Sequence, residues 1–158
     1  MNYRIENHES FRIVGIAQPL YQELEKNFSI VPKMWQDASV NGTVQKLAGY
    51  MDAQPMGLLG VSDCNTEAQG KYMIAVASTH PKGEFEEFII PAATWGHLSG
   101  ERGSNLSIQE LEKRIVTEWL PTSGYEYGSA PDLEVYLNPD PQNAKYEVWI
   151  PVVKRQQP

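Results

Sequence analysis

The chain has 158 residues and a formal net charge of −7, from 13 lysines and arginines against 20 aspartates and glutamates. This length is that of one domain, and a hydrophobic share of 41% is too high for a disordered chain. The acidic balance argues against a general nucleic-acid binder, because contacts to phosphate need a surplus of lysine and arginine.

The sequence also bears on cellular location. The N-terminus lacks the apolar stretch of a signal peptide, and no window approaches about 18 consecutive apolar residues, the length of a membrane-spanning helix. The single cysteine, Cys64, cannot form an internal disulfide, which is typical of a reducing compartment. We therefore expect a cytoplasmic protein that does not enter a membrane.

The first half of the chain predicts a strand, helical segments and two further strands. Leu20, Leu24 and Phe28 recur at the four-residue spacing of a helix. Pro32 is suited to the first turn of a second helical piece, where its missing N–H is not needed. The predicted elements are, in chain order, a strand over 11–16, the two helical pieces, a short helix over 44–51, and strands over 56–61 and 72–77.

The second half repeats this order after Pro81-Lys82-Gly83. Ser107 and Glu110 form a capping box, in which the serine caps the start of a helix and the glutamate reaches back to it. An apolar stripe follows, and Leu120-Pro121 ends the helix. The predicted elements are a strand over 85–90, this helix, and strands over 133–137 and 146–153.

Both halves therefore have the order strand, helix, strand, strand. Lys71–Val76 and Lys145–Ile150 occupy the same place in the two series, at an offset of 74 residues, and share a Lys-Tyr pair followed by apolar residues. This repeat predicts an α+β fold of two βαββ halves, about 2–79 and about 84–154, within a single domain over 1–158. Joined edge to edge, they would form one antiparallel sheet with helices on one face and a ligand cleft at the seam.

Glu147 is the leading candidate for a functional carboxylate. Its strand is apolar on both faces, so a carboxylate beside Trp149 is predicted to be partly desolvated, which raises its pKa unless a cation or donors hold the charged form. Such a group can attract a cationic ligand or act as a general base. The alternative is an exposed edge-strand glutamate that discourages aggregation.

A second acidic strand, Leu133–Leu137, carries Glu134 and Tyr136 between three apolar residues that we expect to face the core. If this strand pairs with that of Glu147, both acids border one cleft. Tyr136 could then donate its hydroxyl to a carboxylate and offer its ring to a flat ligand. The alternative is an ordinary amphipathic strand with a polar outer face.

Aromatic residues are numerous enough to line a pocket. Aromatic faces together with a carboxylate are what a lipophilic cation requires, through cation–π attraction and neutralisation of its charge. Core packing is the alternative for each ring taken singly. The candidates are Trp35, Trp95, Trp149, Tyr72, Tyr125 and Tyr127.

Metal and nucleophile chemistry are not predicted. His8, His80 and His97 are scattered, and neither they nor Cys64 have the spacing of metal ligands. The segment Gly60–Cys64 lacks the closing glycine of a nucleophile elbow. We therefore assign no catalytic residue, no metal and no cofactor.

Several segments together resemble the gyrase-inhibitor-like (GyrI-like) family, a small-molecule-binding domain that is also the effector-binding part of AraC-type and MerR-type multidrug regulators. These segments are Met1–Ile5, Leu133–Asn138 and Tyr146–Pro151, while Ile30–Trp35 and Trp119–Pro121 resemble free-standing bacterial members. The resemblance covers about residues 3–153. It implies a duplicated βαββ fold with a ligand cleft between the halves.

The resemblance also implies roles for individual residues. Family members have an acidic residue of the last strand at the bottom of the pocket, and Glu147 matches it. Glu134 and Tyr136 match a second recurrent strand motif, and Trp95 falls where members often place a pocket aromatic. Relatives that read DNA carry a separate helix-turn-helix domain, for which this chain has no room, so we expect a stand-alone binder and no direct nucleic-acid contact.

Three functions are compatible with these features. The preferred one is a binding protein for amphipathic, cationic or planar aromatic small molecules, because Glu147 lies on an apolar strand and no catalytic motif is present. The second is a protein-interaction module whose acidic surface meets a basic partner such as a DNA topoisomerase. The third is a hydrolase of electrophilic small molecules, in which Glu147 activates water while Trp95 or Trp35 packs the substrate.

Overall fold

The structure, a computed structural model, describes residues 2–21, 24–63, 70–99, 108–137 and 145–156. Its strands are β1 (Asn2–His8), β2 (Phe11–Pro19), β3 (Leu58–Asp63), β4 (Lys71–Ala77), β5 (Glu86–Ile90), β6 (Ala93–Ser99), β7 (Tyr125–Tyr127), β8 (Asp132–Tyr136) and β9 (Tyr146–Lys154). Its helices are α1 (Leu24–Val40), α2 (Thr43–Tyr50) and α3 (Ile108–Arg114), the last continuing through a π-helical turn (Ile115–Trp119) into a 3₁₀ turn (Leu120–Thr122).

One antiparallel sheet of nine strands organises the fold. Eight strands follow the order β1-β6-β9-β8-β3-β4-β2-β5, and β7 pairs with β9 off this path. The order is symmetric about the pairing of β8 with β3, since β6, β9 and β8 on one side correspond to β2, β4 and β3 on the other. Each side contains a strand-helix-strand-strand unit, and the two units meet edge to edge.

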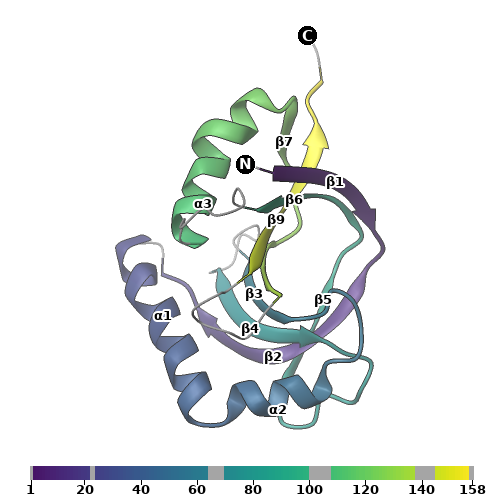
Figure 1. The fold of residues 1–158 in the computed structure, drawn as a ribbon. Helices are drawn as coiled ribbons and strands as arrows, with labels where there is room; N and C mark the ends of the chain where they lie inside the picture. Colours follow the sequence, from purple (N-terminus) through teal and green to yellow (C-terminus); the bar gives the residue numbers. More distant parts are fainter. Residues whose placement is uncertain (1, 22–23, 64–69, 100–107, 138–144, 157–158) are drawn as a thin grey trace.

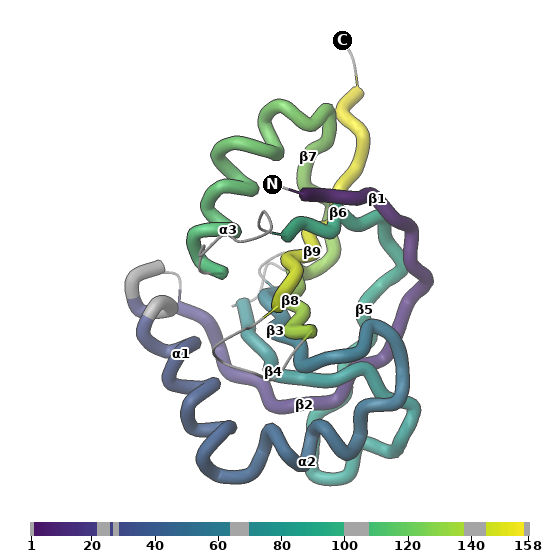
Figure 2. The backbone as a smooth tube through the Cα atoms, in the orientation of Figure 1, coloured from purple at the N-terminus to yellow at the C-terminus, as the bar shows by residue number. Residues whose placement is uncertain are grey.

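The two ends of the sheet lie close together. β1 at one end leads through residues 9–10 into β2 near the other end, and β5 leads through residues 91–92 into β6 in the same way. A link of two residues spans only about 10 Å, so the sheet has to curl. Figures 1 and 2 show the resulting arch of strands, with β1 continuing into β2 along its outer side.

The helices cover one face of this curled sheet. Strand register aligns Ile74, Gly60, Glu134 and Val148 across four neighbouring strands on that face. α1 and α2 pack on the half formed by β2 and β4, and α3 packs on the half formed by β6 and β9 (Figure 1). The seam strands β3 and β8 lie between these two apolar clusters and present mainly polar side chains there.

The opposite face is enclosed by the curl of the sheet itself. Its core is built from β2, β3, β4, β5, β6, β8 and β9, so hydrophobic burial draws the two ends of the sheet together. The buried residues are Ile13, Leu59, Val61, Met73, Ala75, Ile90, Trp95, Ala130, Leu133, Val135 and Trp149.

Many of the elements expected from the sequence are present. The α+β class and the single antiparallel sheet are confirmed, and the short helix over 44–51 is α2. The repeated segments Lys71–Val76 and Lys145–Ile150 lie in β4 and β9, which hold equivalent places on either side of the seam.

Two expectations about elements are wrong. α1 runs unbroken from Leu24 to Val40 with Pro32 inside it, because packing of Met34 and Ala38 on the sheet outweighs the backbone hydrogen bond that proline removes. The strand over 85–90 does not lead into the second helix. It pairs with β2 as β5, and the unpredicted β6 takes its place before α3.

The polar edge strand β1 and the three-residue β7 were also not predicted. Leu133 and Val135 are buried as expected, whereas Leu137 follows the end of β8 and is 52% exposed. Cys64, the capping serine Ser107 and the turn expected over 138–141 lie outside the described residues. Within the described ranges, no helix is long and apolar enough to cross a membrane.

Replacing Leu133, which is fully buried beside the seam, tests this arrangement. We expect Leu133→Ala to lower the free energy of unfolding by about 2–5 kcal/mol, because a cavity replaces packed side-chain contacts. Leu137→Ala removes an exposed leucine from the same segment and should change stability by about 0.5 kcal/mol or less. Urea unfolding followed by circular dichroism measures both, and equal losses would contradict the register of β8.

Candidate functional site

Polar side chains of the two seam strands gather on the helix-covered face. Ser62 of β3 and Asp132 and Glu134 of β8 line a cavity of about 200 Å³ together with Glu112 of α3. Apolar side chains of β9 and of the π-helical turn complete the wall. The cavity therefore lies where the two halves of the sheet meet.

Glu134 is held by hydrogen bonds from both halves of the fold. Its Oε1 accepts from the hydroxyl of Tyr72 at 2.7 Å, and its Oε2 accepts from the hydroxyl of Tyr136 at 3.0 Å. Trp35 Nε1 donates to the Tyr72 hydroxyl at 2.8 Å, and the Trp35 ring meets the Tyr136 ring edge-on at 5.0 Å between centroids. This aromatic network ties α1 and β4 to β8 and fixes the direction of the carboxylate.

Gly60 makes the contact between Tyr72 and Glu134 sterically feasible. It lies in β3, between the strands that carry these two residues, and on the same face. A Cβ at this position would collide with the Tyr72 hydroxyl and lie 2.7 Å from Glu134 Oε1. The absent side chain therefore lets the tyrosine reach across β3.

Three carboxyl groups share the cavity. Burial, reinforced by the charges of Glu134 and Asp132, raises the pKa of Glu112 to about 8. Burial also raises the pKa of Asp132 to about 7, although a hydrogen bond from Tyr127 opposes the shift. The pKa of Glu134 is raised by burial too, against its two tyrosine hydrogen bonds. No lysine or arginine is among the described residues that line the cavity.

Glu147 lies on the other face of the sheet. Register pairs Val135 with Glu147 and Glu134 with Val148, so the two acids point in opposite directions. The expectation that both border one cleft is therefore wrong, although their strands do pair. Glu147 is only 13% exposed, and its two oxygens accept from the Arg4 guanidinium at 2.7 and 3.4 Å.

A polar cluster surrounds Glu147 and satisfies its charge. Trp149 Nε1 donates to Glu147 Oε1 at 3.4 Å, and Arg4 Nη2 donates to His97 Nδ1 at 3.1 Å. Burial chiefly, together with the charge of Arg4, lowers the pKa of His97 to about 4, which keeps the ring neutral near neutral pH. Because Arg4 already neutralises Glu147, a cationic ligand would have to displace an arginine there.

The aromatic residues proposed from the sequence are divided between the two faces. Trp35, Tyr72 and Tyr136 lie on the cleft side, as described above. Trp95 and Trp149 belong to the enclosed core of the opposite face, where Trp95 has no exposed surface. The structure thus brings one acid and three aromatics together and separates them from the other three proposed site residues.

The two remaining aromatic candidates also separate. Tyr127 lines the cavity, whereas Tyr125 stacks on Trp119 at 6.5 Å between ring centroids in the layer of α3.

Sequence reasoning missed Glu112, Asp132 and Gly60. The strand period did carry a signal for Asp132, because it lies two residues before Glu134 and so shares its face. Glu112 lies four residues after Ile108 and three before Ile115, so it lies beside the apolar stripe of the helix. A glutamate in that position is expected to be half-buried. The role of Gly60 depends on which strands flank β3, and no local pattern contains that information.

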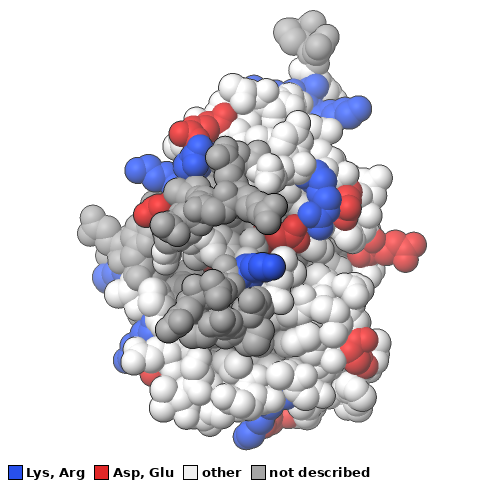
Figure 3. Space-filling view, viewed as in Figure 1, with Lys and Arg blue, Asp and Glu red and all other residues white. Residues whose placement is uncertain are grey.

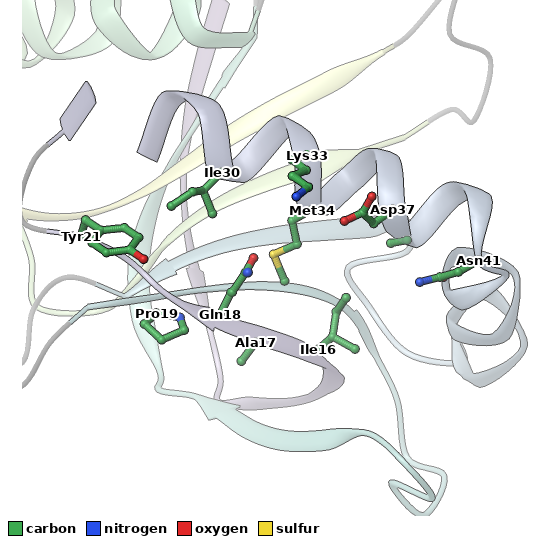
Figure 4. A pocket seen from close by; sticks show the side chains of 11 residues that line it. Ile16, Ala17, Gln18, Pro19, Tyr21, Ile30, Lys33, Met34, Asp37 and Asn41 are labelled. Atoms are coloured by element: carbon green, nitrogen blue, oxygen red, sulfur yellow. The ribbon is translucent and has the colours of Figure 1, made fainter. Parts of the chain in front are cut away.

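A larger hollow of about 560 Å³ lies elsewhere, between α1 and the end of β2. Figure 4 shows Met34 and Ile30 of α1 facing Ile16 and Gln18 of β2 across it. Its charged residues are exposed to solvent, which screens them. We therefore take the carboxylate-lined cavity as the candidate site, since buried charge discriminates between ligands more strongly.

Comparison with known families identifies the chain. The sequence profile of the GyrI-like small molecule binding domain matches residues 1–153. The chain belongs to the GyrI-like family. The family expected from the resemblance is thereby confirmed. A search of curated proteins gives no match.

Solved structures share the fold at low sequence identity. SAV2435 bound to tetraphenylphosphonium is 19% identical, with a TM-score of 0.81 over 97% of this chain and 94% of that chain. An integron cassette protein from the mobile metagenome of Vibrio cholerae is 14% identical, with a TM-score of 0.65 over 96% and 95% of the two chains. The C-terminal domain of EcmrR is 14% identical, with a TM-score of 0.58 over 98% of both chains.

The raised pKa values of Glu112 and Asp132 make the stability of this GyrI-like domain depend on pH. Each group binds its proton more tightly in the folded chain than in the unfolded chain. Its contribution is therefore complete below the unfolded pKa of about 4 and is lost as pH rises through the folded values of about 7 and 8. We expect the free energy of unfolding to fall by on the order of 1 kcal/mol between about pH 6.5 and pH 8.5.

Urea unfolding across this range measures the effect, and starting at about pH 6.5 limits the contribution of histidines. Glu112→Gln should flatten the dependence, because the amide does not titrate. Glu86→Gln, which changes an exposed glutamate of β5, should leave the slope intact. If the free energy of unfolding does not change over this range, these carboxyls are ionised throughout it.

Proposed function

We propose that the chain binds amphipathic, lipophilic cations in the cleft between two βαββ halves, with Glu134 as the central counter-charge and Glu112 and Asp132 beside it. Tyr127 lines the cavity, and the half-buried Trp35 and Tyr136 would supply further aromatic surface beside Glu134. Glu147, the acid favoured by the sequence, is the alternative counter-charge.

The chief observation behind this proposal is that, among the described residues, the side chains that donate hydrogen bonds to Glu134 are neutral. Tyr72 and Tyr136 orient its oxygens without cancelling a negative charge. A carboxylate buried without a cation is costly, so it either binds a proton or attracts a positive ligand. By contrast, Glu147 already has a cationic partner in Arg4.

The surrounding surface suits a cation that is also apolar. Aromatic faces attract cations through their quadrupole, and apolar walls favour ligands with little hydration to lose. A cavity of about 200 Å³ is smaller than a typical drug-sized pocket of about 300–1,000 Å³. A bulky ligand would therefore place part of its surface beyond the described lining. The relative SAV2435, bound to tetraphenylphosphonium, has the same fold and supports this ligand class.

Replacing the two acids in turn tests the assignment. Isothermal titration calorimetry with tetraphenylphosphonium should show binding to the unmodified chain and about tenfold weaker binding to Glu134→Gln, a loss of about 1.4 kcal/mol. Glu147→Gln should stay within about twofold. Thermal unfolding of both variants checks that they remain folded.

A neutral ligand separates charge from shape. Triphenylphosphine oxide, which carries aromatic rings without a net charge, should bind the unmodified chain and Glu134→Gln equally. If Glu147→Gln is the variant that loses the cation, the ligand binds on the other face of the sheet. If neither variant changes its affinity, charge recognition by these acids is excluded.

Binding should also strengthen as pH rises. Tetraphenylphosphonium does not titrate, so its affinity reports the ionisation of the protein. Protons on Glu112 and Asp132, with pKa values of about 8 and 7, oppose a cation. We expect affinity to rise between about pH 6 and pH 8, by at most about tenfold per pH unit for each proton released. Titrations with Glu112→Gln should show a weaker dependence of affinity on pH. An affinity that does not change with pH would contradict the release of protons from Glu112 and Asp132 when the cation binds.

The two other functions have less support from the described residues. Among the described residues on the face seen in Figure 3, acidic and basic side chains are scattered without a continuous patch of either sign, so these residues offer no extended acidic surface to a basic protein. Hydrolysis through Glu147 would require a carboxylate free to activate water, whereas Glu147 is paired with Arg4.

A further inference from the structure

Two histidines and a glutamate converge on the face of the sheet opposite the cleft. Glu6 and His8 come from β1, and His97 comes from the neighbouring strand β6. His8 Nε2 lies 3.1 Å from His97 Nε2 and 3.4 Å from Glu6 Oε2, and His97 Nε2 lies 3.6 Å from the same oxygen. The three ligand atoms thus form a nearly equilateral triangle.

This triangle has the dimensions of a metal site. Imidazole nitrogen and carboxylate oxygen bind zinc at about 2.0–2.2 Å, so two ligands at a tetrahedral angle lie about 3.3–3.5 Å apart. We propose that Glu6, His8 and His97 bind a divalent cation of the zinc class and thereby clip β1 to β6. Three protein ligands leave a fourth position for water, on the side where Glu6 and His8 are partly exposed.

Packing holds the two imidazole rings in place without the metal. The His8 ring stacks on Trp149 with 4.9 Å between centroids and a 20° interplanar angle, and the His97 ring lies 3.9 Å from the same indole. His97 has a side chain only 1% exposed, with its Nε2 directed at the other two ligands. A site whose ligands are already positioned loses little conformational entropy on binding.

Arg4 opposes metal binding because its hydrogen bond favours the His97 tautomer that cannot bind a metal through Nε2. Arginine only donates, so the contact from Arg4 Nη2 makes His97 Nδ1 an acceptor and places the ring proton on Nε2. A neutral His97 that binds metal through Nε2 must carry its proton on Nδ1 instead, and the contact with Arg4 must then break. Arg4 keeps its ion pair with Glu147 at 2.7 Å, so the guanidinium has another partner. In Arg4→Gln, the amide oxygen can accept from Nδ1–H, which favours the metal-binding tautomer.

Local spacing could not reveal this site. His8 and His97 are separated by 89 positions and become neighbours only because β1 pairs with β6. Only the alternation along β1, which places Glu6 and His8 on one face, is visible in the sequence.

Zinc titration of the full chain, prepared without a histidine tag and stripped with chelator, tests the proposal. Calorimetry should show one equivalent bound, thermal unfolding should shift upward, and Co²⁺ should give the visible absorption of a tetrahedral site. Glu6→Gln and His8→Asn change partly exposed ligands, so the chain should still fold, and each should weaken binding by about tenfold or more. Arg4→Gln should tighten it by about tenfold.

His80→Asn is the matched control. His80 pairs with Asp52 at 3.3 Å, an exposed histidine–carboxylate pair outside the proposed cluster. Its loss should leave zinc affinity unchanged. The proposal is overturned if the unmodified chain binds no zinc, or if binding survives in both Glu6→Gln and His8→Asn. Tetraphenylphosphonium binding is measured on Glu6→Gln and His8→Asn and should not change, because the two sites lie on opposite faces.

Discussion

The backbone pairing of β3 with β8 is the constraint on which the rest of this molecule depends. It joins two strand-helix-strand-strand units into one sheet and leaves a gap between their helical layers. It also decides which side chains face that gap. Because strand side chains alternate, a slip of one residue would turn Glu134 into the core and bring Leu133 and Val135 to the cleft. Register at this single pair of strands therefore determines whether the cleft is polar.

The cleft places acidic groups in surroundings that favour their neutral forms. Glu112, Asp132 and Glu134 all have raised pKa values, chiefly because burial penalises their charge. A proton can satisfy such a group, and under the function proposed above a lipophilic cation would take the place of that proton. Burial thus makes a charged carboxylate costly here, protonation relieves that cost, and the proposed ligand class, positive and poorly hydrated, would relieve it in the same way.

How much of this could be predicted from the sequence depends on whether the signal is local. A run of apolar residues identified β2, the alternation of apolar and polar residues identified β8, and the apolar stripe behind Glu110 identified the helix that carries Glu112. β6 was missed because Ala93–Ser99 is largely buried on both faces and shows no alternation.

The choice between Glu147 and Glu134 as the counter-charge needed information that no single strand contains. Glu147 lies on a strand that is apolar on both faces and Glu134 on a strand that alternates, and both were candidates. Glu147 differs because Arg4, 143 positions away, lies beside it. A contact made by a distant part of the chain therefore decides that Glu147 has a cationic partner.

The place of β1 in the sheet has a consequence for the order in which the chain can fold. β1 pairs with β6, so that Asn2 meets Ser99, and this partner is synthesised long after β1 itself. Contacts of such large sequence separation form slowly, because closing the intervening loop is entropically costly. During that interval β1 is an unpaired edge, the kind of segment through which chains aggregate. Its largely exposed sequence, with Arg4, Glu6 and His8 on one side, makes it a poor template for a foreign strand.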